Sequence, residues 1–271
     1  MEIRFGHKTL IMGIVNATPD SFYDGGAHCD ADSAFDHAMK LLDEGADILD
    51  IGGESSRPGA EAVGEELELE RVCPVVERIR AARPDAVISV DTYKPRVADE
   101  ALSLGAAMIN DIRGLSDPRM ASVCAAHDAW AVIMHMKGAP QTMQRDTAYE
   151  SLIDDIESFL LDAASRALTA GVRPTRIILD PGIGFGKSLE QNYRIIQNIP
   201  RFRGTGYPVL VGLSRKSLIG GVLPEGEDRL PATIALDAVC AASGADIVRV
   251  HDVRAHVLAL RAVDMLRKVP A

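Results

Sequence analysis

The sequence has few aromatic residues and no surplus of positive charge. Phe, Trp and Tyr together make up 4% of the 271 residues, and 29 Lys and Arg stand against 39 Asp and Glu, which gives a formal net charge of −10. Proteins that bind nucleic acids usually carry a basic excess or a clustered basic stripe. We therefore expect no nucleic-acid partner, and an anion site in this chain must concentrate its Arg and Lys locally.

Cysteines and long apolar runs are also scarce. The four cysteines (Cys29, Cys73, Cys124 and Cys240) form no CxxC pair and no Cys/His spacing typical of a zinc site. We interpret them as reduced thiols of a cytoplasmic protein. No apolar run approaches the roughly 18 residues of a membrane span, and the first residues lack the basic-then-apolar pattern of a signal peptide. The sequence thus predicts a cytoplasmic protein that does not associate with membranes.

Short apolar runs rich in Ile and Val alternate with longer amphipathic stretches along the whole chain. Runs that carry no charge until their ends indicate strands buried on both faces. Apolar residues repeated every three and four positions indicate helices. Strands are predicted at 10–16, 46–53, 87–92, 108–112, 130–136, 177–182, 208–214 and 247–252. Helices are predicted at 33–44, 65–82, 95–104, 118–127, 152–170, 189–199, 231–243 and 254–268.

These alternating units predict a single α/β domain over residues 1–271, a TIM (β/α)8 barrel. Barrels of this kind typically hold about 250 residues in one piece. A doubly wound open sheet remains the alternative, because periodicity alone does not prove that the sheet closes. Segment 2–10 contains a Gly6-His7 turn signal, and we expect it to form a short hairpin that caps the bottom of the barrel.

Polar side chains cluster at the carboxyl ends of the predicted strands, where barrel enzymes hold their active sites. One polar residue at a strand end reflects only contact with water, but converging sets from every strand predict a functional pocket. In chain order the sets are Asn16; Glu54, Ser55, Ser56 and Arg57; Asp91; Asn110 and Asp111; His135; Asp180; Ser214, Arg215 and Lys216; and Arg249, His251 and Asp252.

Acceptors in this set favour a flat ligand rich in N–H donors. Asp91 and Asp180 offer carboxylates, and a carboxylate matches a guanidine-like edge through two parallel N–H···O bonds. Asn110 adds an amide between them in the chain order. The glycines of segment 179–187 would let the backbone approach a ligand closely.

Positive charge is concentrated at the seventh and eighth strands, where barrels often bind phosphate. Lys216 follows the seventh strand, and Arg249 and His251 lie two positions apart on the eighth, so they point to the same side. The sequence therefore predicts an anion site at this end. A structural ion pair between Arg249 and a neighbouring carboxylate is the alternative.

Eight segments, taken together and in order, resemble the dihydropteroate synthase family over nearly the whole chain. They are GIVNATPDSFYDGG (13–26), DIGGESSRPGA (50–60), SVDTYKP (89–95), INDIRG (109–114), MHMKGAP (134–140), LDPGIGFGK (179–187), VGLSRKSLIG (211–220) and RVHDV (249–253).

The resemblance implies a transferase of folate biosynthesis. Such an enzyme condenses (7,8-dihydropterin-6-yl)methyl diphosphate with 4-aminobenzoate, through a pterin-methylene cation, to give 7,8-dihydropteroate and diphosphate. It further implies Mg2+ as cofactor, sulfonamides as inhibitors, and a homodimer formed through the last helices.

The matched motifs also carry the family's site residues over to this chain. The pterin would be held by Asp91, Asn110, Met134, Asp180, Gly212, Lys216 and Arg249. The diphosphate would be held by Asn16, Arg57, Arg249 and His251, with Asn16 also a ligand of Mg2+. The 4-aminobenzoate pocket would be shaped by Phe22, Ser56, Arg57, Pro58, Phe185, Lys216 and Ser217. Catalysis would involve Asp24, Asp91, Lys216, Arg249 and His251.

Two other functions stay open. A pterin-binding methyltransferase that passes a methyl group to a corrinoid protein shares the barrel and the pterin site. It does not need the Ser-Arg-Lys-Ser segment at 214–217, the Arg-Val-His segment at 249–251 or the TPDSF loop at 18–22. A catalytically inactive paralogue that binds pterin is the third interpretation, and the intact loops and Lys216 argue against it.

Overall fold

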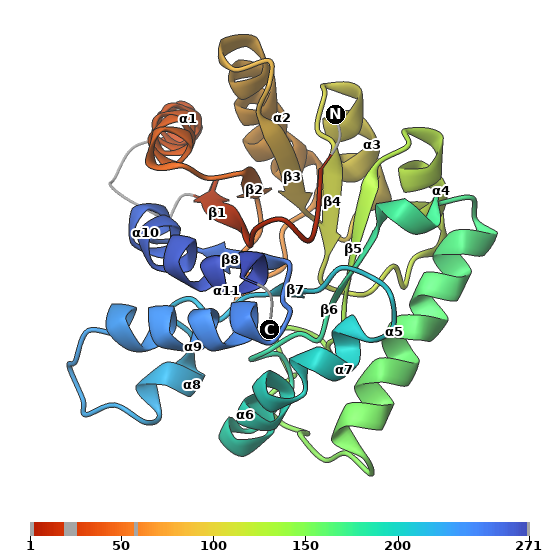
Figure 1. Cartoon of the computed structure of the whole chain (residues 1–271). Helices are drawn as coiled ribbons and strands as arrows, with labels where there is room; N and C mark the ends of the chain where they lie inside the picture. Colours follow the sequence, from red (N-terminus) through yellow and green to blue (C-terminus); the bar gives the residue numbers. More distant parts are fainter. Residues whose placement is uncertain (1–2, 19–25, 57–58, 270–271) are drawn as a thin grey trace.

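A computed structural model describes residues 3–18, 26–56 and 59–269 of the chain. Its strands are all parallel and lie in one sheet, in the order β6-β5-β4-β3-β2-β1-β8-β7 (Figure 1). They are β1 (Leu10–Asn16), β2 (Ile48–Gly52), β3 (Val87–Asp91), β4 (Met108–Asp111), β5 (Trp130–Met134), β6 (Ile177–Asp180), β7 (Leu210–Val211) and β8 (Ile247–Val250). All eight predicted strands are therefore confirmed, with some shorter than expected.

The two ends of the strand order meet and close the sheet into a barrel. Leu179 of β6 forms a parallel bridge with Val209, the residue before β7. The backbone N–H of Leu179 donates to the carbonyl of Pro208 at 2.9 Å. Closure excludes the doubly wound open sheet and confirms the barrel.

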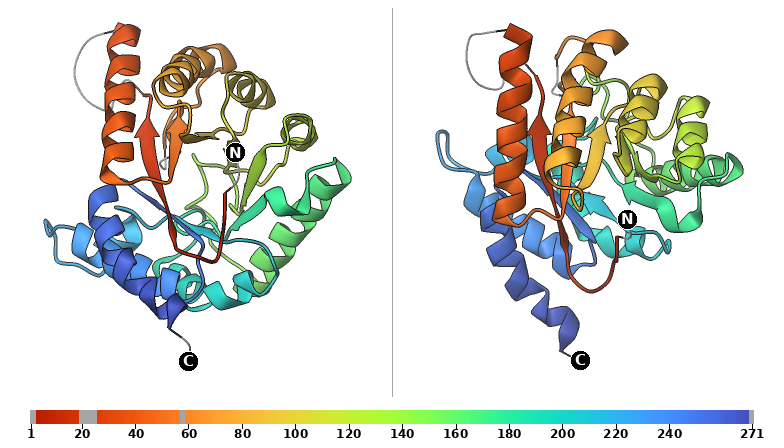
Figure 2. Two further views of the ribbon diagram at one scale, coloured as in Figure 1. Left: turned by 45° about the horizontal axis from the view of Figure 1, so that its top comes forward. Right: turned by 90° about the horizontal axis from the view of Figure 1, so that it is seen from above.

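Helices surround the strands on the outside of the barrel (Figure 2). They are α1 (Gly26–Glu44), α2 (Glu65–Ala82), α3 (Pro95–Ser103), α4 (Pro118–Ala126), α5 (Leu152–Thr169), α6 (Leu189–Gln197), α7 (Ile199–Arg203), α8 (Ser217–Gly220), α9 (Leu230–Ala242), α10 (Val253–Val263) and α11 (Met265–Lys268), with a 3-10 turn at Pro174–Arg176. None of the described helices is long and apolar enough to cross a membrane.

Local sequence explains where several of these helices begin. Pro95, Pro118 and Pro231 lie in first turns, where a missing backbone N–H costs no hydrogen bond. Ser188 and Gln191 form a capping box at the start of α6, each side chain bonding the other's backbone N–H. The helix predicted at 254–268 divides at Asp264 into α10 and α11.

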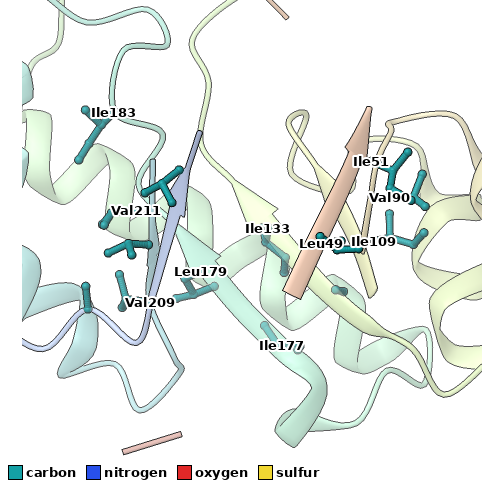
Figure 3. Packing of buried hydrophobic residues seen from close by; sticks show 14 of the residues in the cluster. Leu49, Ile51, Val90, Ile109, Ile133, Ile177, Leu179, Ile183, Val209 and Val211 are labelled. Carbon is teal, nitrogen blue, oxygen red and sulfur yellow. The ribbon is translucent and has the colours of Figure 1, made fainter. Parts of the chain in front are cut away.

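Alternation along the strands produces two apolar layers. One layer fills the space between strands and helices, and Figure 3 shows part of it, including Leu49, Ile133 and Val211. The other lies within the ring of strands near their amino ends and includes Met12 and Trp130. Successive strand residues point to opposite faces of the sheet. The first inward-facing residues of the strands are the apolar ones of this inner layer, at the bottom of the barrel.

The segment before β1 covers the barrel bottom, but not as a hairpin. Residues 3–9 contain no strand, and a bend at 6–8 includes Gly6 at φ +86°. Ile3 and Phe5 pack against the inner apolar layer, and the Phe5 ring meets Trp130 edge-on at 5.4 Å between centroids. The predicted hairpin is therefore wrong. Arg4, His7 and Lys8 are exposed, so the segment has too few apolar positions to form two pairing strands.

Candidate functional site

Polar residues replace apolar ones on the inner face as each strand approaches its carboxyl end. On β8, for example, Ile247 belongs to the inner apolar layer, and Arg249 lies one pleat higher. The same step occurs on other strands, from Ile48 to Asp50, from Met108 to Asn110 and from Ile178 to Asp180. Period-two alternation thus brings three predicted side chains, Asn110, Asp180 and Arg249, into one interior cluster together with Asp50.

Arg249 lies at the centre of this cluster and joins two carboxylates. Its Nε donates to Asp50 Oδ2 at 2.6 Å, and its Nη2 donates to Asp91 Oδ2 at 2.9 Å. Asp50 is fully buried and also accepts from Ser89 Oγ at 2.6 Å and from Asn110 Nδ2 at 2.9 Å. The structural ion pair weighed for Arg249 therefore exists, at the predicted site.

Asp50 is a site residue that sequence reasoning missed. It lies in the middle of the apolar run that forms β2 rather than at its end. A charge inside an otherwise apolar strand was the available signal, because a buried carboxylate needs several donors to offset its lost hydration.

Asn110 carries an acceptor that has no partner in the described part of the protein. Its Nδ2 donates to Asp50, whereas its Oδ1 is buried and forms no hydrogen bond. Leaving a buried acceptor unsatisfied costs about 1–3 kcal/mol. A ligand N–H that reached Oδ1 would recover this cost.

Burial shifts the ionisation of Asp91 toward the neutral carboxyl. Burial raises the pKa of Asp91 to about 7, the Arg249 guanidinium opposes the shift, and the Asp50 carboxylate adds to it. Asp91 therefore changes charge near physiological pH, as carboxylates at functional sites often do.

Asp180 and Lys216 form a second pair of groups with shifted ionisation. Burial raises the pKa of Asp180, and Lys216 opposes that rise. Burial lowers the pKa of Lys216 to about 8, and Asp180 opposes that fall. Asp180 Oδ1 accepts the backbone N–H of Gly182 at 2.7 Å, which fixes the carboxylate at the end of β6.

Lys216 follows β7 and reaches back over the loop after β6. Its Nζ donates to the carbonyl of Ile183 at 2.5 Å and lies 4.4 Å from the centre of the Phe185 ring. A Cβ on Gly212 would lie 3.8 Å from that Nζ and 3.7 Å from Arg249 Cβ. The glycine therefore leaves room between the two cations.

The apolar wall of the pocket comes from β5 and the loops beside it. Met134, predicted at the pterin site, packs with Ile112, Met143 and Phe185 in a separate buried cluster. Flat apolar surface of this kind suits an aromatic ring, because stacking and burial both favour it.

Three of the four residues predicted to hold the anion, Asn16, Arg249 and His251, lie at or near the carboxyl ends of the neighbouring strands β1 and β8. Met12 of β1 pairs with Arg249 of β8. Asn16 and His251 each lie an even number of residues further along, so both face the same side as that pair. His251 Nδ1 is 2.9 Å from Ser214 Oγ, which also accepts the His251 backbone N–H at 3.2 Å.

The second-substrate residues are only partly described. Ser56 is half-buried and lines a small cavity beside Asp91 and Tyr93, and Ser217 is exposed at the start of α8. The remaining predicted residues lie outside the described part of the chain: Phe22, Asp24, Arg57 and Pro58.

Known proteins show the same architecture. The family of pterin-binding enzymes matches residues 12–251. The dihydropteroate synthase of Bacillus subtilis is 48% identical over 254 residues, which cover 93% of this chain and 86% of that protein. The structure of dihydropteroate synthase from Clostridium difficile, determined in the presence of pteroic acid, has a TM-score of 0.92 and 44% identity, covering 98% of this chain and 99% of that one. The Yersinia pestis enzyme with a sulfonamide drug has a TM-score of 0.91 and 40% identity, covering 99% and 100%.

Proposed function

We propose a residue-level account of catalysis on the premise that the chain belongs to the pterin-binding enzymes and, within them, to the dihydropteroate synthase family. The activity is a transferase reaction that joins a dihydropterin to 4-aminobenzoate and releases diphosphate. Relatives at 44–48% identity over most of their length are synthases, so the methyltransferase and the inactive paralogue give way to this function. The unpaired, buried Oδ1 of Asn110, which lies next to Asp91 across the β3–β4 ladder, is the observation that carries the assignment of the pterin pocket.

The pterin ring would lie across the carboxyl ends of β3 to β7. Its N–H edge matches the acceptors in the pocket, with Asp180 facing the guanidine-like portion and Asn110 Oδ1 accepting another N–H. Lys216 would donate to the ring's acceptor edge, and Met134 would supply an apolar surface. Gly212 leaves the space that the ring needs beside Lys216 and Arg249.

The diphosphate would lie over β1 and β8, where Asn16, Arg249 and His251 share a face. Arg249 keeps Nη1 for an anion while Nε and Nη2 hold Asp50 and Asp91. We also assign Arg57 to this group on the family motif alone.

The donor set at the end of β1 fits Mg2+ as an ion shared with substrate. In the described ranges no group of three or more His, Cys, Asp or Glu side chains could hold a metal by itself, whereas exposed Asn16 offers an amide oxygen. Mg2+ usually keeps several waters and binds through one or two protein oxygens and substrate phosphates. Bound there by Asn16 and the diphosphate, the ion would neutralise charge on the leaving group.

Chemistry at the methylene carbon then follows from leaving-group stabilisation. The C–O bond to diphosphate breaks, and its electron pair leaves with the diphosphate, whose charge Arg249 and His251 stabilise. The resulting pterin-methylene cation lies near the carboxylate of Asp91, and we assign Asp24 on the first loop to the same task. The amine of 4-aminobenzoate attacks the carbon and then releases a proton to solvent. Positioning by the protein supplies the remaining acceleration.

The 4-aminobenzoate pocket would form next to Lys216 and Phe185. The 4.4 Å contact between the Lys216 Nζ and the Phe185 ring gives this region an apolar wall with a cation above it, which suits a benzoate. Ser56 and Ser217 would supply hydroxyls, and Phe22, Arg57 and Pro58 are assigned from the motif. Sulfonamides, which mimic 4-aminobenzoate, would compete for this place.

We also propose a homodimer that forms in the cytoplasm through the last helices. Val239, Leu258, Met265 and Leu266 on α9, α10 and α11 are about half or more exposed, at 50%, 52%, 51% and 69%. Helix α10 packs against both α9 and α11, and exposed apolar side chains gathered on neighbouring helices favour an interface. The described cysteines are free thiols, consistent with a reducing compartment.

Diphosphate release measured with purified protein tests the proposed function. Release should require (7,8-dihydropterin-6-yl)methyl diphosphate and 4-aminobenzoate together, and dihydropteroate should appear in equal amount. Full release without 4-aminobenzoate would indicate a hydrolase instead, and methyl transfer from a methylated pterin to a free corrinoid would restore the methyltransferase.

A further inference from the structure

Lys187 is a buried lysine with no assigned role in the reaction. It ends the glycine-rich loop after β6 and is 3% exposed. Its Nζ lies 2.8 Å from the carbonyl of Gly182, 2.9 Å from that of Phe185, 3.2 Å from that of His135 and 3.0 Å from His135 Nδ1. Its hydrogen bonds in the described part of the protein include no carboxylate. Carbonyl oxygens only accept, so Nζ acts as a donor to the loop.

The loop at 182–186 is fixed along its whole length by side-chain donors. Lys187 donates to two of its carbonyls, and the others accept from Lys216 Nζ at Ile183, from Gln144 Nε2 at Gly184 and from Tyr149 Oη at Gly186, at 2.5, 3.0 and 3.0 Å. Its shape also depends on close backbone approach. A Cβ on Gly182 would lie 1.8 Å from the carbonyl oxygen of His135.

This loop determines where two groups of the second-substrate pocket lie. The carbonyl of Ile183 accepts from Lys216, and the ring of Phe185 lies under the same Nζ. The Lys187 Nζ holds the carbonyl of Gly182, the residue before Ile183, and the carbonyl of Phe185 itself. A shift of the loop would therefore move both the wall of the pocket and the cation above it.

Burying the Lys187 amine is costly for its charged form. Burial lowers the pKa of Lys187 well below its usual value, Asp180 opposes that shift, and Lys216 adds to it. Burial, with a further contribution from Lys187, lowers the pKa of His135 to about 3, so the ring is neutral. A buried methionine of similar volume would avoid the desolvation cost of the amine. The amine is therefore best explained by the hydrogen bonds that it donates.

We propose that Lys187 is a positioning residue for 4-aminobenzoate, acting by holding the 182–186 loop so that Phe185 and Lys216 form the pocket for the second substrate. This rests on the proposed function, since the pocket is defined by that reaction. Lys187 does not touch either substrate. Its loss should therefore affect the Michaelis constant of 4-aminobenzoate far more than that of the pterin substrate.

Chemical rescue of a Lys187→Ala variant tests the proposal. The substitution removes three methylenes and the amine, a volume that n-propylammonium can occupy among the same four acceptors. KM for 4-aminobenzoate should rise about tenfold or more, because the two loop carbonyls, of Gly182 and Phe185, lose their donor at about 1–3 kcal/mol each. KM for the pterin substrate should change less than threefold. Added n-propylammonium should lower the raised KM, whereas tetramethylammonium, which has no N–H, should not.

Lys40→Ala provides a matched control, because Lys40 lies on α1, is 69% exposed at its side chain and pairs only with Glu44 in the described structure. Its kinetics and its response to n-propylammonium should equal those of the wild type. An unchanged 4-aminobenzoate KM in Lys187→Ala would overturn the proposal. So would an equal rise for both substrates that accompanies a lower melting temperature and does not respond to n-propylammonium.

A second pair of variants applies if Lys187→Ala does not fold. Lys187→Met fills the space without a donor, and Lys187→Gln keeps two N–H donors on a shorter chain. The 4-aminobenzoate KM should rise more in the Met variant than in the Gln variant, and equal values would overturn the proposal. Wild-type protein that releases no diphosphate with both substrates would instead refute the proposed function itself.

Discussion

Two substitutions of Asp50 should separate its contribution to the stability of the fold from its effect on the pKa of Asp91. Its carboxylate accepts hydrogen bonds from Ser89, Asn110 and Arg249 at 2.6–2.9 Å, and no part of it reaches solvent. Asp50→Ala removes all three acceptor contacts. Asp50→Asn can keep an oxygen toward Asn110 and Arg249 while its amide faces the Ser89 hydroxyl, so mainly the charge is lost.

The magnitudes follow from what each donor loses. In Asp50→Ala, the buried donors on Ser89 and Asn110 are each left unsatisfied, at about 1–3 kcal/mol apiece. Arg249 keeps Asp91 and is partly solvated, so its loss is smaller than the 3–5 kcal/mol of a fully broken buried pair. We expect Asp50→Ala to lower the free energy of unfolding by about 4 kcal/mol. For Asp50→Asn we expect about 1 kcal/mol, typical of one hydrogen bond.

The pH dependence gives the electrostatic half of the prediction. Asp50 is one of the charges that raise the pKa of Asp91 to about 7, after burial. Removing that charge in Asp50→Asn should lower the pKa of Asp91. If ionised Asp91 stabilises the pterin cation, the acidic limb of the kcat/KM profile should move to lower pH in the variant.

Urea unfolding at pH 7.5 and a kcat/KM profile from pH 5 to 9 measure the two effects. Asp43→Asn serves as a control, because Asp43 is 77% exposed at its side chain and meets Arg83 only at 3.3 Å in the described structure. A loss below about 1 kcal/mol in Asp50→Ala would refute the reasoning from unsatisfied donors. An acidic limb that stays in place, or moves to higher pH, would refute the electrostatic coupling.

Three further predictions concern the anion site, the order of binding and a buried ion pair. Arg249→Ala should weaken binding of the diphosphate-bearing pterin far more than binding of a pterin without diphosphate, and equal losses in calorimetry would remove Arg249 from the anion site. Because ordering a loop costs on the order of 1 kcal/mol per residue, 4-aminobenzoate should bind weakly to free enzyme and tightly once Mg2+ and diphosphate are present. Equal affinity in both titrations would mean that the pocket is preformed. Asp237 and His256 form a fully buried pair at 3.1 Å. Burial opposes the shift of His256, but Asp237 raises its pKa, and burial raises the pKa of Asp237. The folded protein therefore holds these protons more tightly than the unfolded chain. The stability due to His256 is fully present below its unfolded pKa of about 6.5 and is lost as the pH rises through the higher folded value. The melting temperature should fall more steeply above pH 6.5 in the wild type than in a double Asp237→Leu, His256→Leu variant, and parallel curves would count against this linkage.

The strands could be predicted from the sequence because burial on both faces leaves a distinctive apolar run. A common side for Arg249 and His251 was predicted from their spacing of two residues, and the structure turns Arg249 into the barrel, against Asp50 and Asp91. Asp50 could not be identified as a site residue in the same way. Its role depends on hydrogen bonds from Ser89, Asn110 and Arg249, which lie on three other strands. Such convergence is a property of the closed barrel and not of any one segment.

Boundaries were predicted less well than elements. The first helix begins at Gly26, seven residues before the predicted start at residue 33. The prediction missed its early turns because they carry Asp30 and Asp32 and lack the apolar spacing of the later turns. For segment 3–9 the sequence contained a signal, but it was misinterpreted. A turn signal at Gly6 suggested a hairpin, although apolar packing of Ile3 and Phe5 under the barrel decides the conformation.

The contact between β6 and β7, where the sheet closes into a barrel, is the least hydrogen-bonded seam between neighbouring strands. Seven of the neighbouring strand pairs are joined by ladders, whereas this one is joined by the single bridge from Leu179 to Val209 and one adjacent hydrogen bond. Asp180 and Lys216 lie on opposite sides of that seam, Asp180 at the end of β6 and Lys216 in the segment after β7. Fewer backbone hydrogen bonds hold the sheet together here than between the other neighbouring strands, so this is where a small change in strand spacing would cost least. We therefore expect substitutions beneath this seam to change the separation of Asp180 and Lys216, and with it the affinity for a ligand that contacts both.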